Sequence, residues 1–361
     1  MRLRGVVAGG VLAALAATTL LLAGCVSPRW EGPPSDHFDG TRFHNKTPFD
    51  VGLGDLLRFY ATRDPGEWVR NLLLPPGVPP SQRVDDGSLR LTFVNHATVL
   101  VQVDGMNLLT DPIWSERASP LSWAGPRRYR PPGIRFSDLP PIDVVVISHN
   151  HYDHLDIPTL RRLATIHQPV FVVPAGDQVL LEEAGIAQVV ALDWWQSHRL
   201  VNGCALTAVP VRHWSGRTLG DRNLSLWAGY VIESAGGPIY FAGDTGYDDH
   251  FADAHARFGP MRAALLPIGA YKPRWLTAYQ HMDPSDAIRA HIELQAAFSL
   301  GIHHGTFELA DDGMHEPAAQ LARVQRAHAL HDMRFAAGVE GSAYSLAAKE
   351  QSRPCNSQGT S

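Results

Sequence analysis

A dense group of metal-capable side chains follows a predicted buried strand in the middle of the chain. His149, His151, Asp153 and His154 fall within six residues, directly after the β-branched run at 144–148. Imidazole nitrogens and carboxylate oxygens suit zinc, and suit related metals less selectively. In extended backbone, His149 and His151 would project from the same side. A solvated, histidine-rich loop is the alternative, which this density of ligand types at a strand end disfavours.

Three further residues of the same kinds follow other apolar runs. They are His213, Asp244 in a Gly-Asp-Thr-Gly segment, and His303. Open α/β layers place their sites at the carboxyl ends of strands, so all these side chains can reach one edge. Taken alone, His213 would more often be structural, and Gly-Asp-Thr-Gly would be a tight turn. Their occurrence together favours a metal site.

Three other histidines are left out of the expected metal set. His96 and His198 follow less specific segments, although His96 could support a ligand through a hydrogen bond. His304 would point away from His303 if the backbone there is extended.

The order of these motifs resembles the metallo-β-lactamase superfamily. Five further blocks are similar to the branch containing N-acylphosphatidylethanolamine-hydrolysing phospholipase D, namely 109–120, 125–128, 271–275, 280–284 and 302–307. The resemblance runs from about residue 38 to about residue 341. It implies an α/β fold, the αββα sandwich of that superfamily, as a single catalytic domain.

The resemblance also implies a centre with two zinc ions (Zn2+). His149, His151 and His213 would hold one ion, Asp153, His154 and His303 would hold the second, and Asp244 would bridge both. Two metals about 3.5–4 Å apart can activate a water and stabilise a leaving oxygen. No cysteine lies among these residues, which disfavours a closed structural site.

The expected catalytic residues are Asp153 and His281. His281 precedes a helix start at Asp283-Pro284, and the resemblance places the matching histidine at the catalytic centre. We expect His281 to bind a substrate phosphate or to protonate the leaving group. A loop histidine bonded to the backbone is the alternative. Lys272 and Arg274 would bind an anionic part of the substrate.

A second basic group lies in a Pro- and Gly-rich loop, comprising Arg127, Arg128, Arg130 and Arg135. Anionic headgroups would suit these side chains, and a solvated basic loop is an equal alternative. Three tryptophans could line a groove for acyl chains or fill the core, namely Trp114, Trp123 and Trp275.

The N-terminus resembles a bacterial lipoprotein signal peptide. Arg2 and Arg4 precede an uncharged apolar stretch that ends in Leu-Ala-Gly-Cys at Cys25. We expect residues 1–24 to be removed and Cys25 to be lipidated. An uncleaved membrane anchor is the alternative. Val26 after the cysteine favours the outer membrane, so we expect a lipid-anchored envelope protein facing the periplasm.

The rest of the chain divides into three parts. Residues 25–87 are expected to be a tether and a segment wrapping the domain, residues 88–350 the hydrolase domain, and residues 351–361 a disordered tail. Predicted helices cover 53–60, 158–166, 178–183, 284–295 and 318–329. We expect no structural disulfide between Cys204 and Cys355.

Composition excludes one class of partner and bounds the others. The chain has 361 residues, 45% of them hydrophobic, and a net charge of −5. This length supports a sizeable core, and the charge argues against nucleic-acid binding. We expect a lipid or small-molecule substrate and a membrane as partners, and a homodimer is left open.

Three functions are compatible with these features. The first is a membrane-tethered dinuclear zinc phosphodiesterase of phospholipase D type, acting on lipids like N-acylphosphatidylethanolamine. The second is a hydrolase of the same fold acting on a lactone, amide or other small ester. The third is a metal-binding envelope protein without turnover, which the complete ligand set disfavours. The branch-specific blocks favour the first by analogy.

Overall fold

The computed structural model describes residues 30–48, 51–70, 72, 77–218, 220–328 and 332–348. The predicted signal peptide, the lipidation site Cys25 and the predicted disordered tail with Cys355 lie outside the described residues. Among the helices that are described, none is both long and apolar enough to cross a bilayer.

The first of two seven-stranded sheets joins an antiparallel meander to parallel strands. β1 and β2 pair antiparallel, as do β2 and β3, whereas β3 to β6 run parallel. Asp104 and Gly105 both have positive φ, 51° and 73°, which fits a two-residue hairpin turn between β2 and β3. The order is β14-β1-β2-β3-β4-β5-β6, with β1 (Leu89–Asn95), β2 (Thr98–Val103), β3 (Met106–Thr110), β4 (Val144–Val146), β5 (Val170–Pro174), β6 (Val189–Leu192) and β14 (Ala343–Leu346).

The second sheet has the complementary arrangement. β7, β8, β9 and β10 are antiparallel neighbours, and β10 to β13 run parallel. Its order is β13-β12-β11-β10-β9-β8-β7, with β7 (Ser197–Arg199), β8 (Ala205–Val209), β9 (Gly229–Ile232), β10 (Ile239–Phe241), β11 (Ala263–Pro267), β12 (Ser299–Ile302) and β13 (Phe335–Ala337).

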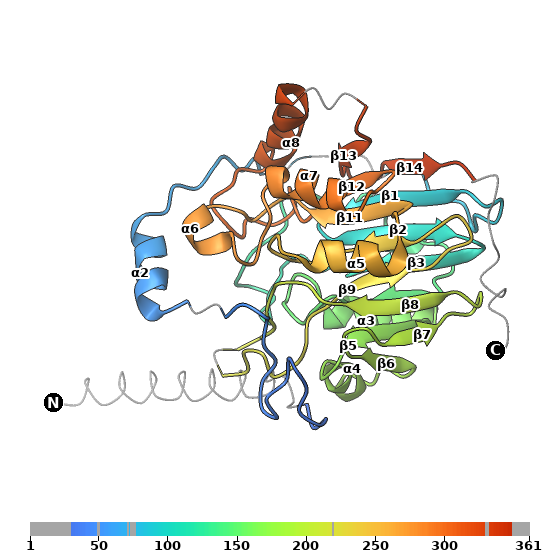
Figure 1. Cartoon of the computed structure of the whole chain (residues 1–361), viewed down its shortest axis with the longest axis horizontal. Coiled ribbons are helices and arrows are strands. Elements are labelled where there is room, and N and C mark those ends of the chain that lie inside the picture. Colours follow the sequence, from blue (N-terminus) through green and yellow to red (C-terminus); the bar gives the residue numbers. More distant parts are fainter. Residues whose placement is uncertain are drawn as a thin grey trace, which may run out of the picture.

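Helices cover the outer face of each sheet (Figure 1). α3 and α4 pack on the first sheet through Leu160, Leu163 and Leu181, and α5, α7 and α8 pack on the second. The layers are therefore helix, sheet, sheet and helix, and the predicted αββα sandwich is confirmed. The described helices are α2 (Leu53–Ala61), α3 (Ile157–Ile166), α4 (Gln178–Glu183), α5 (His250–Phe258), α6 (Arg274–Thr277), α7 (Pro284–Glu293), α8 (Glu316–Ala327) and the 3-10 turn η1 (Phe136–Asp138).

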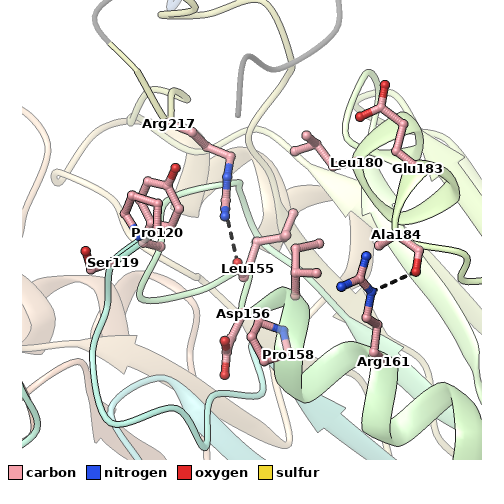
Figure 2. A pocket seen from close by; sticks show the side chains of 12 residues that line it. Ser119, Pro120, Leu155, Asp156, Pro158, Arg161, Leu180, Glu183, Ala184 and Arg217 are labelled. Carbon is pink, nitrogen blue, oxygen red and sulfur yellow. Dashed lines mark hydrogen bonds between the residues drawn. The ribbon is translucent and has the colours of Figure 1, made fainter. Parts of the chain in front are cut away.

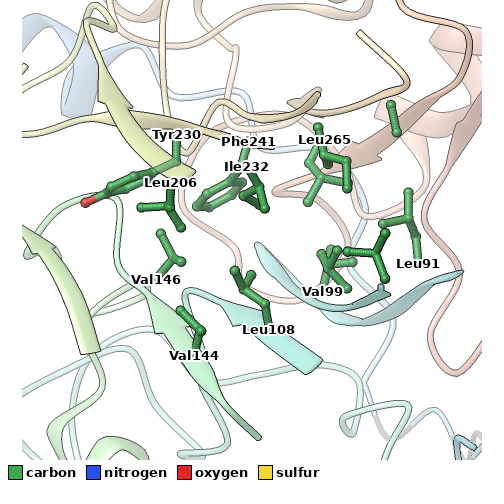
Figure 3. Close-up of a cluster of buried hydrophobic side chains, with 14 of the residues drawn as sticks. Leu91, Val99, Leu108, Val144, Val146, Leu206, Tyr230, Ile232, Phe241 and Leu265 are labelled. Atoms are coloured by element: carbon green, nitrogen blue, oxygen red, sulfur yellow. The ribbon is translucent and has the colours of Figure 1, made fainter. Parts of the chain in front are cut away.

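The main core lies between the two sheets. Figure 3 shows side chains of the first sheet facing those of the second, with Leu91, Val99, Leu108, Val144 and Val146 on one side and Leu206, Tyr230, Ile232, Phe241 and Leu265 on the other. All of them are buried, so the strands that carry the candidate site rest on a closely packed base.

Several element boundaries differ from those predicted. β4 ends at Val146 rather than at residue 148, because the Ser148 N–H donates to Asp111 Oδ1 at 2.7 Å instead of extending the strand. β11 was not predicted, because its Ala and Leu residues carry no β-branching although the strand is fully buried. The helix start predicted at Asp283 is confirmed, since its carboxylate accepts from the Ser285 and Asp286 N–H groups.

The described part of the N-terminal segment lies against the domain. Phe38 and Phe43 are buried beside Trp227. The Asn45 amide donates to the carbonyl of His213 at 2.7 Å, so the segment reaches a predicted metal ligand. Further along, the Trp68 indole donates to the carbonyl of Asp312 at 3.0 Å.

One prediction about the cysteines is wrong. Cys204 is buried and disulfide-bonded, whereas the sequence led us to expect no structural bridge. The sequence alone could not show which segments approach the buried Cys204, which directly precedes β8.

Candidate metal centre

The seven predicted metal ligands lie at one edge of the sandwich. His149, His151, Asp153 and His154 follow β4, and His213, Asp244 and His303 follow β8, β10 and β12. His151 and Asp153 are half-buried and the other five are buried. Because the sheets face each other, the loops leaving these strands bring side chains from distant parts of the sequence together. Metal ligation by these residues stays a prediction, but the structure does gather them as it requires.

The first group contains three imidazoles. His149 Nε2 lies 2.8 Å from His151 Nδ1, and His213 Nε2 lies 3.3 Å from the same atom. The three rings could each offer one nitrogen to a common ion. The sequence placed His149 and His151 in extended backbone, whereas both lie in the loop after β4. This loop still brings their rings within 4.4 Å, centroid to centroid.

The second group contains two imidazoles and a carboxylate. His154 Nε2 and His303 Nε2 lie 3.3 Å and 3.4 Å from Asp153 Oδ2. The stacked rings of His154 and His303 are 5.2 Å apart. Together with His96, these three residues form a group that could hold a second ion.

Asp244 lies between the two groups. Its Oδ2 is 3.0 Å from His303 Nε2, 3.3 Å from His154 Nε2 and 3.9 Å from His213 Nε2. One carboxylate therefore faces nitrogens from both groups, which is the position that a bridging ligand requires.

Several polar atoms at this centre lack a hydrogen-bond partner of normal geometry among the described residues. They include His151 Nε2, His154 Nε2, His281 Nδ1, His303 Nε2 and Asp244 Oδ1. Buried polar groups normally find partners, because desolvating them without one is unfavourable. Converging lone pairs of imidazole and carboxylate fit divalent metal ions, so the residues present fit the zinc centre that the sequence predicts.

The electrostatics divide the residues into two sets. Burial disfavours the charged carboxylates, but the charges of His154 and His303 outweigh it and hold the pKa of Asp244 well below its usual range. Burial likewise opposes protonation of His303, and the carboxylates of Asp244 and Asp153 reverse this, raising its pKa to about 9. By contrast, burial lowers the pKa of His149 and His213, so these rings are neutral at pH 7.

Two residues outside the predicted set hold the ligands in place. His154 Nδ1 lies 2.6 Å from Asp111 Oδ2, and Ser148 Oγ donates to the same carboxylate oxygen. His96 Nε2 lies 2.9 Å from Asp153 Oδ2. The sequence suggested a supporting role for His96 but assigned none to Asp111, although this residue directly follows β3. The position of this acidic residue directly after a neighbouring strand was the signal in the sequence that could have identified it.

His281 turns its ring into the centre. Its Nδ1 is 3.8 Å from Asp244 Oδ2, and its ring stacks on that of His303 with centroids 5.4 Å apart. Burial lowers its pKa to about 4, so the imidazole is neutral. The backbone N–H of His281 donates to the Thr277 carbonyl, which leaves the ring available to the centre.

The other predicted basic residues near this centre are ion-paired. Lys272 pairs with Glu316. Arg274 donates to Asp286 at 2.5 Å and to the carbonyl of His281 at 2.9 Å. Arg274 therefore fixes the backbone that presents His281. Substrate binding by Lys272 and Arg274 stays a prediction.

His304 does not join the metal groups. The extended backbone assumed for it is wrong, since His303 has a φ of 59°. The His304 ring stacks on Phe93 with centroids 5.8 Å apart. His198 lies in the edge strand β7, also outside the centre.

Two cavities border the metal centre. One of about 480 Å³ includes His213 and is lined by Arg42, Thr47, Trp214, Arg222 and Tyr279 among others. The other, of about 330 Å³, lies beside the loop after β4 and includes no predicted ligand (Figure 2). There, Arg217 donates to the carbonyls of Asn150 and Leu155, and so holds both ends of the segment that carries His151, Asp153 and His154.

The three tryptophans that could have lined one groove differ in their contacts and in their exposure. Trp114 packs on Phe136 and donates to the Ile134 carbonyl. Trp123 is 75% exposed, and Trp275 is 40% exposed beneath Arg58. None of the three lines either of the two cavities described above.

Sequence comparison places this fold and centre in a known family. A profile of the β-lactamase superfamily domain matches residues 106–304, which is more than half of the chain. The chain belongs to the metallo-β-lactamase superfamily, as its motifs led us to expect, and it is a metal-dependent hydrolase of that fold.

Two curated relatives and one solved structure are similar to the chain. The uncharacterized protein Rv0906 of Mycobacterium tuberculosis is 41% identical, over 69% of this chain and 67% of its own length. N-acyl-phosphatidylethanolamine-hydrolyzing phospholipase D 1 of Caenorhabditis elegans is 39% identical, over 62% of this chain and 66% of its own. An isothiocyanate hydrolase from Delia radicum gut bacteria has a TM-score of 0.58 at 21% identity, over 72% of this chain and 100% of its own, which shows the shared fold.

Proposed function

We propose that this protein is a membrane-tethered phosphodiesterase of phospholipase D type, with two zinc ions, acting on lipids like N-acylphosphatidylethanolamine. The observation that carries the proposal is the position of Asp244 between two three-residue ligand groups, with a neutral His281 beside it. The similarity to the Caenorhabditis elegans phospholipase D supports the substrate class.

The ligand groups define what each part of the centre would do. His149, His151 and His213 would hold one ion, and Asp153, His154 and His303 the other, with Asp244 shared. When bound, two such ions supply an activated water and neutralise charge on the phosphate oxygens.

The chain itself would supply orientation. Because burial keeps His281 neutral, its ring suits donation of a hydrogen bond to a phosphate oxygen better than release of a proton. Arg274 holds the His281 carbonyl, and the Asp286 carboxylate holds Arg274. This chain of contacts fixes the ring against the rest of the centre.

The cavity beside His213 is the proposed site for the polar part of the substrate. Arg42 and Arg222 give it positive charge, and the Arg222 guanidinium lies 4.5 Å from the Trp214 ring centroid. Trp214 in turn packs on His151, with ring centroids 4.1 Å apart. An anionic phosphodiester entering here would meet guanidinium groups before it reaches the metal ligands.

The tether would concentrate the enzyme at its substrate. A lipid on Cys25 would keep the cleft near the bilayer, raising effective substrate concentration without any new contact. We place the protein in the bacterial envelope, at the outer membrane facing the periplasm.

The reaction adds water across one phosphodiester bond. The bond between phosphorus and the ethanolamine oxygen breaks, giving phosphatidic acid and an N-acylethanolamine, whose oxygen takes a proton. The test is a panel of phospholipids and small esters assayed with zinc-loaded full-length protein, with product identification by mass spectrometry. Release of N-acylethanolamine supports the proposal. Turnover of a lactone or amide without any phosphodiester would replace it with the small-ester hydrolase.

A further inference from the structure

Five arginines line a cavity that contains no residue of the metal centre. The cavity has a volume of about 430 Å³, and its arginines are Arg70, Arg117, Arg127, Arg128 and Arg130. Among the described residues that line it, two carry carboxylates, namely Glu116 and Glu308. The cavity therefore has an excess of positive charge in a protein whose net charge is negative.

Two of these arginines stand opposite each other in the backbone. Arg117 and Arg127 form an isolated antiparallel β-bridge. Like charges directly opposite across such a bridge repel and are destabilising. Arg127 has one ion pair, a 3.4 Å contact with Glu116 in which both side chains are more than 60% exposed. Arg117 donates to the Gly125 carbonyl, and among the described residues no carboxylate pairs with it.

A third arginine places a buried charge at the base of this loop. Arg128 is 7% exposed and donates to the carbonyls of Ser115 and Ile113. Burial lowers its pKa to about 10, so it remains charged at neutral pH. No described carboxylate lies within ion-pair distance of its guanidinium. Its direct contacts are with carbonyls and with the Phe307 ring, and the carboxylates of Glu116, Asp156 and Glu340 act on it from beyond ion-pair distance. A bound anion would therefore give this buried charge a direct partner of opposite sign.

The loop is fixed before any ligand binds. The Tyr129 N–H donates to the Thr306 carbonyl at 2.8 Å, and the Tyr129 hydroxyl donates to Glu308 at 2.6 Å. Arg130 pairs with Glu340 at 2.9 Å. Because the backbone and these side chains are already held, ligand binding would cost little conformational entropy.

We propose that this cavity is a second binding site, separate from the metal centre, for a phosphate group. Planar guanidinium groups bind phosphate oxygens in pairs, and the bridge between Arg117 and Arg127 brings two of them to the same cavity. The phosphate belongs either to an anionic phospholipid headgroup or to a free phosphate ion. The site does not depend on the hydrolytic reaction proposed above.

The test is isothermal titration calorimetry on the full-length, zinc-loaded protein in neutral detergent. The probes are inorganic phosphate, dihexanoyl phosphatidic acid and dihexanoyl phosphatidylcholine at equal ionic strength. Removing both opposed charges, in Arg117→Gln/Arg127→Gln, should weaken binding of the phosphate probes by at least about tenfold. The matched control is Arg199→Gln/Arg326→Gln, because Arg199 donates to the Gly203 carbonyl and Arg326 is exposed on α8, both outside the cavity.

Each result has a defined meaning. Phosphate bound at the metal centre is common to all variants, so only the difference between the two double variants reports on the cavity. Tighter binding of phosphatidic acid than of phosphate identifies the lipid headgroup, and equal binding identifies the free ion. Equal affinities in both double variants and in wild type would overturn the proposal. If the double variant fails to fold, the single variant Arg70→Gln, at an exposed position, takes its place. Weaker phosphate binding than in the control then supports the proposal, and unchanged binding overturns it.

Discussion

Asp111 Oδ2 lies 2.6 Å from Nδ1 of His154, so the carboxylate accepts the hydrogen of one ring nitrogen while the other nitrogen faces Asp153 and Asp244. Both side chains are fully buried. This contact fixes the tautomer and the orientation of the His154 ring, and thereby couples the end of β3 to the metal centre.

Asp111→Asn should weaken metal binding by about 10- to 100-fold, because the amide cannot hold His154 Nδ1–H as the carboxylate does. We expect the loss mainly in the group formed by Asp153, His154 and His303. Zinc affinity is measured by competition with a chromophoric chelator. Asp249→Asn, on an exposed residue near the same edge, is the control and should bind zinc as wild type does. Unchanged affinity in Asp111→Asn would remove this role.

The ligand set could be predicted from the sequence, and its supports largely could not. Four of the ligands lie close together in the sequence, from His149 to His154. Each of the other three follows a predicted strand. The Asp111 contact spans 43 residues and depends on the parallel register of β3 and β4, which pairs Thr110 with Val146. Nothing local specifies that register. Likewise, the anchoring of Arg274 on the His281 carbonyl depends on a turn of backbone that the residue types do not encode.

Arg217→Gln should loosen the segment that carries three of the ligands. The guanidinium donates to the Asn150 carbonyl at 2.7 Å and the Leu155 carbonyl at 3.1 Å, and a glutamine amide cannot span both. Zinc affinity should fall by about tenfold, since bonds from a charged donor are lost. Arg161→Gln is the matched control, because Arg161 lines the same cavity but donates to the Ala184 carbonyl (Figure 2). Equal zinc affinity in both variants would contradict this reading.

His281→Ala should lose most turnover while keeping two zinc ions per chain. His281→Gln separates the two roles expected for this residue, because an amide can donate a hydrogen bond but cannot transfer a proton. If the ring binds a phosphate oxygen, the glutamine variant should recover activity about tenfold over alanine. Steady-state rates on the best phosphodiester, with zinc content measured alongside, decide between the two. His198→Ala, in β7, should behave as wild type.

The mature protein should begin at Cys25 and carry a lipid there. The motivation is the basic start, the apolar run and the small residues before the cysteine. Mass spectrometry of the purified N-terminus measures this, and Cys25→Ala should move the protein out of the lipid-modified fraction. Detection of an intact Met1, or of a cut elsewhere, would refute the anchor while leaving the metal centre untouched.

Zinc binding at pH 7.5 should release about two protons per chain from histidines, besides the proton that a metal-activated water loses. Burial opposes protonation of His154 and His303, but Asp244 and Asp153 raise the pKa of His303 to about 9 and that of His154 well above its usual value. Both rings are therefore protonated without metal, and each must lose a proton to become a ligand. The raised pKa of His303 stabilises the metal-free fold fully below pH 6.5, and this stabilisation is lost as pH rises through about 9.

Calorimetric zinc titrations in two buffers of different ionisation enthalpy count the protons that zinc binding releases. His281→Ala should release the same number, because burial keeps the pKa of His281 near 4 and that ring holds no extra proton. Release of about one proton or less would show that His154 and His303 are neutral before zinc binds.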